Sequence, residues 1–430
     1  MKRYEQYKDS GVAWVGEIPA HWETVKPKYT VFLQKGTKPQ ELTDEDNGNL
    51  PYLTMDVLRD RANKTTMYPT SVNDLVKVGN GDILVLWDGA NAGEVLFAKD
   101  GYLSSTMARF GFNTNRLDSR YWFYFLKGLE PILKEFAGGT TIPHLDSSKI
   151  MEEPYPIPSI YEQQAIVHYL DYKVAKIDKL IAENEAQVKE LEKYRTAIIS
   201  EVVTKGLNPN VPMRNSGIQW IGEIPAHWDI LPLKRCLASH LMYGANETAE
   251  SDNPTFPRYI RITDIGENNT LRKDTYKTLS PSVAKDYMLQ KGDLLFARSG
   301  ATVGKTYLYN GEFEACFAGY LIKASFNSKM LPKYAYYFTQ TDAYNSWKNQ
   351  VFIQATIQNI GADKYSVLPI CVPPIEEQRA IISSIEDRIK NYNIVIEKLS
   401  EQIEELKAYK IALISEAVTG HIDVRDWQEK

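Results

Sequence analysis

The stretch SGATVGKT, from Ser299 to Thr306, has the residue types of a phosphate-binding loop. A Walker A motif has four residues between its glycines and then a helix, whereas Gly300 and Gly304 enclose three residues and the strand-like TYLYN follows. The related stretch DGANAGE has Glu94 in the place of Lys305. Because a loop that occurs twice carries lysine only once, we expect a tight turn between two strands rather than a nucleotide site.

Other groups that could do chemistry also lack the neighbours that the chemistry needs. The stretch DNPTF, from Asp252 to Phe256, has Thr255 where the Asn-Pro-Pro-aromatic loop of amino-methyltransferases has its second proline. His21 and His227 both stand between Ala and Trp, which favours a role in anchoring a turn. The histidines and cysteines have no metal-ligand spacing. We therefore expect no catalytic residue, no metal and no cofactor in this chain.

The composition is that of an ordinary soluble globular protein, with 43% hydrophobic and 24% charged residues in 430. The three cysteines, Cys236, Cys316 and Cys371, are far apart and indicate buried thiols in a reducing compartment. We find neither a signal peptide nor an apolar stretch of membrane-spanning length, so we expect a cytoplasmic protein. The formal net charge of −5 disfavours nucleic acid only mildly, since a local basic patch is compatible with it.

The chain is an internal duplication, because the phrase SGVAWVGEIPAHW from Ser10 returns as SGIQWIGEIPAHW from Ser216. Further pairs follow in the same order: GDILVLW from Gly81 and GDLLFAR from Gly292, TTIPHL at 140–145 and ATIQNI at 355–360, PSIYEQQAI from Pro158 and PPIEEQRAI from Pro373, and LEKYRTAIISEVVT from Leu191 and LKAYKIALISEAVT from Leu406. Each repeat therefore has a variable front part and a closely matching back part.

The back part of each repeat predicts a long helix. No proline or glycine occurs between Pro158 and Gly206, or between Pro374 and Gly420. Apolar residues step by four and three, as in the seam of a coiled coil. The predicted seam consists of Leu170, Val174, Ile177, Ile181, Asn184, Val188, Leu191 and Ile198, and of Ile385, Ile389, Tyr392, Ile396, Leu399, Ile403, Leu406 and Leu413. We expect the two helices to pack together; the alternative is that each packs on its own domain.

The order of the parts predicts how the helices run. If the second variable part is compact, the end of the first helix and the start of the second lie close together, so the helices are antiparallel. The C-terminus near Thr419 then lies beside the N-terminal phrase, whose tryptophans and prolines are expected to join helix and domain. Each variable part reads as mainly strands followed by one short helix, SRYWFYFLKGL or PKYAYYFTQTDAYNSW.

We therefore predict an α+β protein in which two mixed α/β domains are separated by two antiparallel helices, with a pseudo-twofold circular repeat. The expected boundaries are a first domain at 1–157, a first helix at 158–205, a second domain at 206–372, a second helix at 373–420 and a tail at 421–430. Each seam is roughly 50 Å long at 1.5 Å per residue.

This architecture, with the paired phrases, strands and helix starts quoted above, resembles the specificity subunit of Type I restriction-modification systems over nearly the whole chain. The resemblance implies that each variable part is a target recognition domain reading one half of a bipartite double-stranded DNA site. It implies that the helices set the spacer and dock two methyltransferase subunits, which methylate adenine with S-adenosylmethionine. A restriction subunit using ATP and Mg would join the complex, and this chain would not be an enzyme.

The candidate DNA-contacting residues are polar, basic or aromatic and lie in turns and insertions of the variable parts. Arg or Lys can pair with guanine and Asn with adenine, while other basic residues hold phosphate. The candidates are Lys35, Lys38, Arg59, Arg61, Trp87, Asn91 and His144 in the first repeat, and Tyr243, Asn246, Arg258, Arg261, Arg298, Thr302 and Lys305 in the second. The alternative for each is a solvated surface group. For the whole chain, the alternatives are a coiled-coil scaffold that binds only proteins and a nucleotide-binding enzyme.

Overall fold

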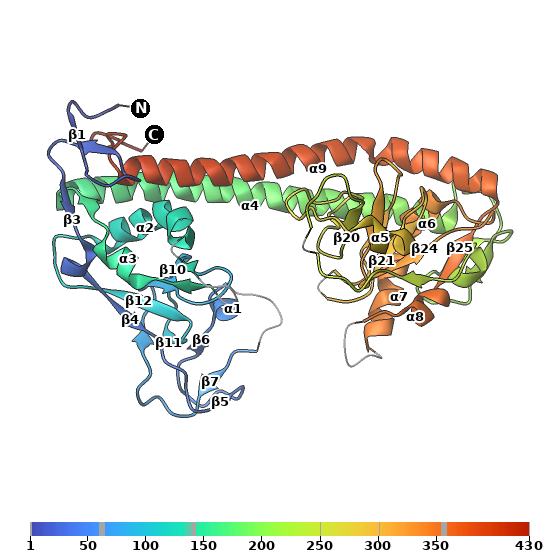
Figure 1. The fold of residues 1–430 in the computed structure, drawn as a ribbon, viewed down its shortest axis with the longest axis horizontal. Coiled ribbons are helices and arrows are strands. Elements are labelled where there is room, and N and C mark those ends of the chain that lie inside the picture. The colour runs from blue at the N-terminus through green and yellow to red at the C-terminus, as the bar shows by residue number, and fades with distance from the viewer. Residues whose placement is uncertain are drawn as a thin grey trace. The chain divides into compact units, whose positions relative to one another are not determined.

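The computed structural model describes residues 2–59, 65–135, 137–138, 143–249, 251–300, 302–353 and 359–429. The chain divides into two compact units (Figure 1). Unit 1 consists of Met1–Glu185 and Glu401–Lys430, and unit 2 consists of Ala186–Ser400. Because unit 1 contains both ends of the chain, the division follows a circular repeat rather than two consecutive halves.

The main sheet of unit 1 has four antiparallel strands in the order β10-β9-β12-β4. They are β4 (Val31–Lys35), β9 (Ile83–Leu86), β10 (Val95–Phe97) and β12 (Met107–Phe112). All residues of β9 are buried, as expected for its uninterrupted apolar run. Helices α2 (Ser119–Glu135) and α3 (Ser147–Glu152) lie between this sheet and the long helix α4 (Figure 1).

Unit 2 repeats this sheet with the order β19-β24-β21-β22. Its strands are β19 (Met242–Tyr243), β21 (Leu294–Ala297), β22 (Thr306–Leu308) and β24 (Leu321–Ala324). Each unit also has a smaller sheet with one parallel pair. These sheets contain β6 (Tyr52–Leu53), β11 (Gly101–Leu103) and β8 (Lys77–Val78) in unit 1, and β20 (Arg258–Ile260) and β23 (Ala315–Phe317) in unit 2.

The remaining elements are short and frame these sheets. In unit 1 they are β1 (Tyr7–Asp9), β2 (Glu17–Pro19), β3 (Glu23–Val25), β5 (Leu42–Thr43), α1 (Met55–Leu58), β7 (Tyr68–Pro69), β13 (Ala137–Gly138), β14 (His144–Leu145), β15 (Tyr155–Ile157) and a 3₁₀ turn at Pro27–Tyr29. In unit 2 they are β16 (Met213–Asn215), β17 (Glu223–Pro225), β18 (Asp229–Pro232), α5 (Pro281–Ala284), α8 (Ala362–Ser366), β25 (Pro369–Val372) and 3₁₀ turns at Leu233–Cys236 and Lys285–Tyr287.

The single short helix expected after the strands of the second repeat is two helices, α6 (Pro332–Phe338) and α7 (Asp342–Ile353). The buried Thr341 separates them, and its hydroxyl accepts a hydrogen bond from Tyr344 N (3.2 Å). A threonine that caps the first free N–H groups in this way starts a new helix. In the first repeat, α2 continues beyond the expected segment to Glu135.

The two long helices are α4 (Ile160–Lys205) and α9 (Ile375–Val418). Each is followed at once or after one further residue by a glycine with positive φ, Gly206 (76°) or Gly420 (77°). A left-handed residue at this place closes the last turn of a helix, and glycine adopts that conformation without strain.

The helices pack in antiparallel orientation within each unit. In unit 1, Lys410 Nζ lies 2.6 Å from Asp178 Oδ1, and Lys407 Nζ lies 3.9 Å from Glu185 Oε1. Residue numbers therefore decrease along α9 in the direction in which they increase along α4. In unit 2, the end of α4 meets the start of α9, where Arg388 contacts Glu201.

The predicted seam positions are buried or half-buried in both helices, while most positions between them are exposed. Leu170 and Ile385, for example, have no exposed surface. Exposed ion pairs contribute only about 0–1 kcal/mol each, so the apolar seam is the main source of stability between the helices.

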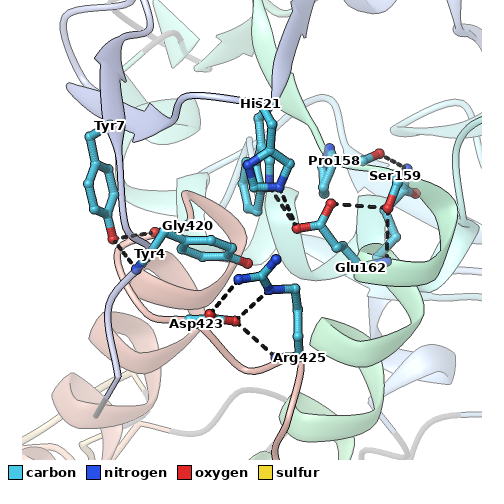
Figure 2. A network of polar contacts seen from close by, with 11 residues as sticks. Tyr4, Tyr7, His21, Pro158, Ser159, Glu162, Gly420, Asp423 and Arg425 are labelled. Atoms are coloured by element: carbon cyan, nitrogen blue, oxygen red, sulfur yellow. Dashed lines mark hydrogen bonds and ion pairs between the residues drawn. The ribbon is translucent and has the colours of Figure 1, made fainter.

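The two ends of the chain lie together in unit 1 (Figures 1 and 2). Asp423 N donates to Lys2 O (2.9 Å), and the hydroxyl of Tyr7 donates to Gly420 O (3.1 Å). The Arg425 guanidinium lies 4.7 Å from the centroid of the Tyr4 ring. These contacts join the start and end of the chain, as the circular repeat predicts.

The three cysteines lie in the hydrophobic clusters of unit 2. All three cysteines are free and buried, and burial raises the pKa of Cys236 to about 11 and that of Cys316 to about 12. Among the described residues, no helix combines the length and the apolar character needed to cross a bilayer.

Candidate functional site

In unit 1, a polar and aromatic cluster lies where strand β9 ends. Trp87 follows the strand directly, and its backbone is held by hydrogen bonds from Trp87 N to Thr106 O (2.7 Å) and from Leu145 N to Trp87 O (2.9 Å). Its indole N–H donates to His144 Nε2 (3.0 Å), and Lys35 Nζ lies 5.2 Å from the centroid of its ring. The structure thus brings together three residues that are far apart in the sequence.

The Asp88 carboxylate connects the two basic side chains of this cluster, Lys35 and His144. It lies 3.3 Å from Lys35 Nζ and also contacts His144 Nδ1. An indole N–H can only donate, so His144 Nε2 carries no proton and the ring donates from Nδ1 to Asp88. The side chains of Lys35 and His144 are 42% and 56% exposed, so a surface ligand can reach both.

In unit 2, the corresponding cluster is built on Arg298, which follows the buried strand β21. Arg298 N donates to Tyr320 O (3.0 Å), and Ile360 N donates to Arg298 O (2.8 Å). The guanidinium lies 4.9 Å from the centroid of the Tyr243 ring and 5.9 Å from that of Tyr320. The Tyr243 hydroxyl in turn accepts a hydrogen bond from Ala362 N (2.9 Å).

The two clusters occupy the same place on the two sheets. Lys35 and Tyr243 each end the edge strand and precede a glycine that packs against backbone carbonyls. A Cβ would lie 2.2 Å from Ser104 O at Gly36 and 2.2 Å from Phe317 O at Gly244, so only glycine fits at either position. The two units therefore share this scaffold but exchange the positions of the cation and the aromatic ring. In unit 1 the cation Lys35 ends the edge strand and Trp87 follows β9, whereas in unit 2 the ring of Tyr243 ends the edge strand and the cation Arg298 follows β21.

The other candidates of the first repeat do not join this cluster by any described contact. Lys38 and Asn91 are exposed. Arg59 forms an ion pair with Glu94, the residue that replaces lysine in the glycine loop. Arg61 lies outside the described residues.

Two candidate arginines of unit 2 make internal contacts. Arg261 forms two hydrogen bonds with the buried Asp264, at 3.1 and 2.8 Å. Arg258 donates to Arg272 O (2.7 Å) and lies 5.3 Å from the centroid of the Tyr276 ring. These contacts hold the smaller sheet to its loops, and contact of either arginine with DNA stays a prediction.

The remaining candidates of unit 2 are Asn246, Thr302 and Lys305. Asn246 is exposed, the Thr302 hydroxyl is buried without a partner among the described residues, and Lys305 contacts Glu267. Strand β22 begins at Thr306 and pairs antiparallel with β21. The expected turn between two strands is thus confirmed, and no helix begins where a phosphate-binding loop needs one.

Residues missed by the sequence analysis extend the unit 2 cluster. A groove of about 800 Å³ borders it and is lined by the exposed Lys234, Arg235 and His240 and by Ala362, whose N–H holds Tyr243. Exposed cations in a groove of this kind are suited to phosphate contacts. The adjacent basic residues in LKRC, which is separated from the end of the repeated phrase by four residues, were the available signal.

In unit 1, the repeated phrase is anchored to the start of α4 (Figure 2). His21 Nε2 lies 2.8 Å from Glu162 Oε1, and Trp22 Nε1 donates to the same oxygen (3.2 Å). Burial raises the pKa of Glu162, but hydrogen bonds from His21, Trp22 and Ser159 outweigh this effect and hold the pKa below its ordinary value. Both histidines of the phrase thus have a structural role, because unit 2 repeats this arrangement with His227 Nε2 at 2.7 Å from Glu377 Oε1.

A buried glutamine follows each of these glutamates and was also missed. Gln163 donates to Arg116 O (2.8 Å) and Pro158 O (2.9 Å) and accepts from Asp118 N (2.7 Å). Gln378 makes the equivalent three hydrogen bonds in unit 2. The adjacent Glu and Gln in both repeat copies were the signal for this helix anchor. Within the described part of the chain, no group of three His, Cys, Asp or Glu residues could hold a metal ion.

The comparisons with known proteins agree with this duplicated scaffold. The sequence model of the family described as Type I restriction modification DNA specificity domain matches residues 19–190 and 243–405. The chain is 27% identical over 424 residues to the Type I restriction enzyme MjaVIII specificity subunit of Methanocaldococcus jannaschii, with 95% of both chains covered. It is 20% identical to the EcoBI specificity subunit of Escherichia coli, over 90% of this chain and 82% of that relative.

A solved structure of a type I R-M system contains a chain of the same fold, with a TM-score of 0.55 and 14% identity. The match covers 93% of this chain and 98% of the other. With a family match in each repeat, this chain belongs to the family of proteins with the Type I restriction modification DNA specificity domain.

Proposed function

We propose that this chain is the DNA specificity subunit of a Type I restriction-modification complex, and that each unit reads one half of an asymmetric bipartite site in double-stranded DNA. The observation that carries the proposal is the pair of clusters at the same place on the two sheets. Lys35, Trp87 and His144 form one cluster, and Tyr243 and Arg298 form the other. Identical clusters would read a palindrome, whereas different side chains on one scaffold read two different half-sites.

The long helices set the distance between the two half-sites in this proposal. Both α4 and α9 begin in one unit and end in the other, without a proline or glycine inside. A stiff connection increases the effective concentration of the second reader only where the spacing of the half-sites matches it. The number of unread base pairs is therefore a property of the helices.

Partner subunits supply the chemistry. Two methyltransferase subunits bring S-adenosylmethionine and methylate adenine, a restriction subunit uses ATP and Mg, and this chain carries out no chemical step. Large apolar side chains exposed on the long helices are available for contact with such partners, and they support this part of the proposal. They are Tyr161, Leu180, Tyr194, Ile394, Val395, Tyr409 and Ile411.

The test is a methylome of the source strain with and without this gene. We expect one split adenine-methylation motif to disappear on deletion and to return when the gene is supplied again. If every methylated motif persists after deletion, the chain does not direct methylation and the proposal is wrong. The scaffold alternative predicts no affinity of the purified chain for DNA.

A further inference from the structure

Arg298 differs from the neighbouring candidate arginines of unit 2 in how its side chain is engaged. Arg258 and Arg261 donate to backbone or carboxylate oxygens. The Arg298 guanidinium makes no hydrogen bond or ion pair with any described residue; its Nε, like that of Arg258, is buried without a partner. Its contacts are instead with the faces of the Tyr243 and Tyr320 rings. A guanidinium in this state has donors available for a ligand.

The position of Arg298 is fixed before any ligand binds. The residue follows a fully buried strand, and both its N–H and its C=O are in backbone hydrogen bonds. Tyr243 is itself tethered through its hydroxyl to Ala362 N. Stacking on aromatic rings holds the plane of a guanidinium and leaves its in-plane N–H groups free, so little side-chain entropy is lost on binding.

A planar fork of two N–H donors matches the O6 and N7 acceptors of guanine in the major groove. Phosphate contacts, by contrast, need positively charged side chains beside the base-contacting residue, and Lys234 and Arg235 provide these in the adjacent groove. We propose that Arg298 reads a guanine in the half-site bound by unit 2, with Tyr243 and Tyr320 positioning its guanidinium. This assignment rests on the proposed function.

Unit 1 cannot read guanine from the equivalent position. Trp87 stands there, and its N–H is already donated to His144. Changing Arg298 therefore alters one half of the recognised sequence and leaves the other half unchanged.

The experiment supplies Arg298→Gln to the deletion strain and reads the methylome. Because Gln pairs with the N6 and N7 of adenine, we expect preference at one base pair to change from G·C toward A·T, with discrimination changed about 10- to 100-fold. Arg298→Lys, which keeps the charge but loses the fork, should relax discrimination at the same base pair. The matched control is Arg272→Gln, an exposed arginine of the same unit, which should leave the motif unchanged.

Several outcomes would overturn the assignment. One is a wild-type motif without guanine in either half. Others are an unchanged motif for both Arg298 variants, or a folded variant, checked by thermal melting, that loses methylation or DNA affinity equally at all sequences, as a phosphate contact would. If the wild-type chain directs no split motif at all, the proposed function itself fails, and that result is distinct from these.

Discussion

At the scale of single residues, the glutamates at the helix starts show how one carboxylate holds several segments together. Glu162 is 8% exposed and accepts hydrogen bonds from Trp22 and Ser159, with His21 Nε2 at 2.8 Å. A glutamine there has one acceptor oxygen instead of two and no charge, so at least one of these donors loses its partner, which costs about 1–3 kcal/mol. We expect Glu162→Gln to lower the stability of unit 1 by this amount at neutral pH, as measured by thermal unfolding.

The loss of stability caused by Glu162→Gln should depend on pH. The folded-state pKa of Glu162 lies below its ordinary value of 4.5, so the ionised carboxylate stabilises the fold fully above that pH. The contribution is lost as the pH falls through the folded-state pKa, and the wild type should then approach the variant in stability. Glu183→Gln, at an exposed pair with Lys179, is the control and should have little effect at any pH. If the difference in stability between the wild type and Glu162→Gln increased as the pH fell, this account would be wrong.

Part of the site was predictable from residue type. Lys35, Trp87, His144, Tyr243 and Arg298 were chosen by residue type and by an expected place in turns or insertions, and the structure brings them together in two clusters. Three of them, Lys35, His144 and Tyr243, lie at the ends of strands rather than in turns. The internal contacts of Arg261 with Asp264 could not be predicted in this way. An arginine that contacts DNA and one that binds a neighbouring carboxylate have the same charge and can occupy the same kind of turn. Tyr320 was missed since its contact depends on pairing between strands distant in sequence.

At the scale of elements, the long helices were predictable almost to the residue. The expected 158–205 and 373–420 are Ile160–Lys205 and Ile375–Val418, because prolines precede both helices and glycines follow them. Many strands have only two or three residues. Such strands are too short to show the alternation that identifies a strand, so their pairing could not be read from the sequence.

The buried face of α9 gives a prediction at this scale. Ile385 has no exposed surface and packs against the end of α4, whereas Ile394 is 41% exposed on the same helix and in the same unit. We expect Ile385→Ala to lower the free energy of unfolding of unit 2 by about 2–5 kcal/mol. Ile394→Ala should remain within about 0.5 kcal/mol of the wild type. Denaturant titration of both variants measures the difference, and equal effects would mean that Ile385 is not a seam residue.

At the scale of the whole molecule, the circular repeat makes the last residues part of the first domain. Ile422 and Val424 are 6% and 4% exposed, and Asp423 binds Lys2. Truncation after Gly420 should therefore destabilise unit 1 by about 3 kcal/mol or more, since burying one such side chain is worth about 1.5–3 kcal/mol. Truncation after Trp427 removes only exposed residues among those described and is the control. Thermal melting that was equally unaffected by both truncations would show that the tail does not contribute.

The exchange of cation and ring between the two clusters also has an evolutionary consequence. At Trp87 and Arg298 the backbone is held by main-chain hydrogen bonds that do not depend on the side chain. A substitution at Arg298 therefore leaves the backbone frame and the anchors at Glu162 and Glu377 intact, whereas Trp87 also packs against the core of unit 1. The recognised sequence can thus change through a few surface positions while the frame that carries them stays the same.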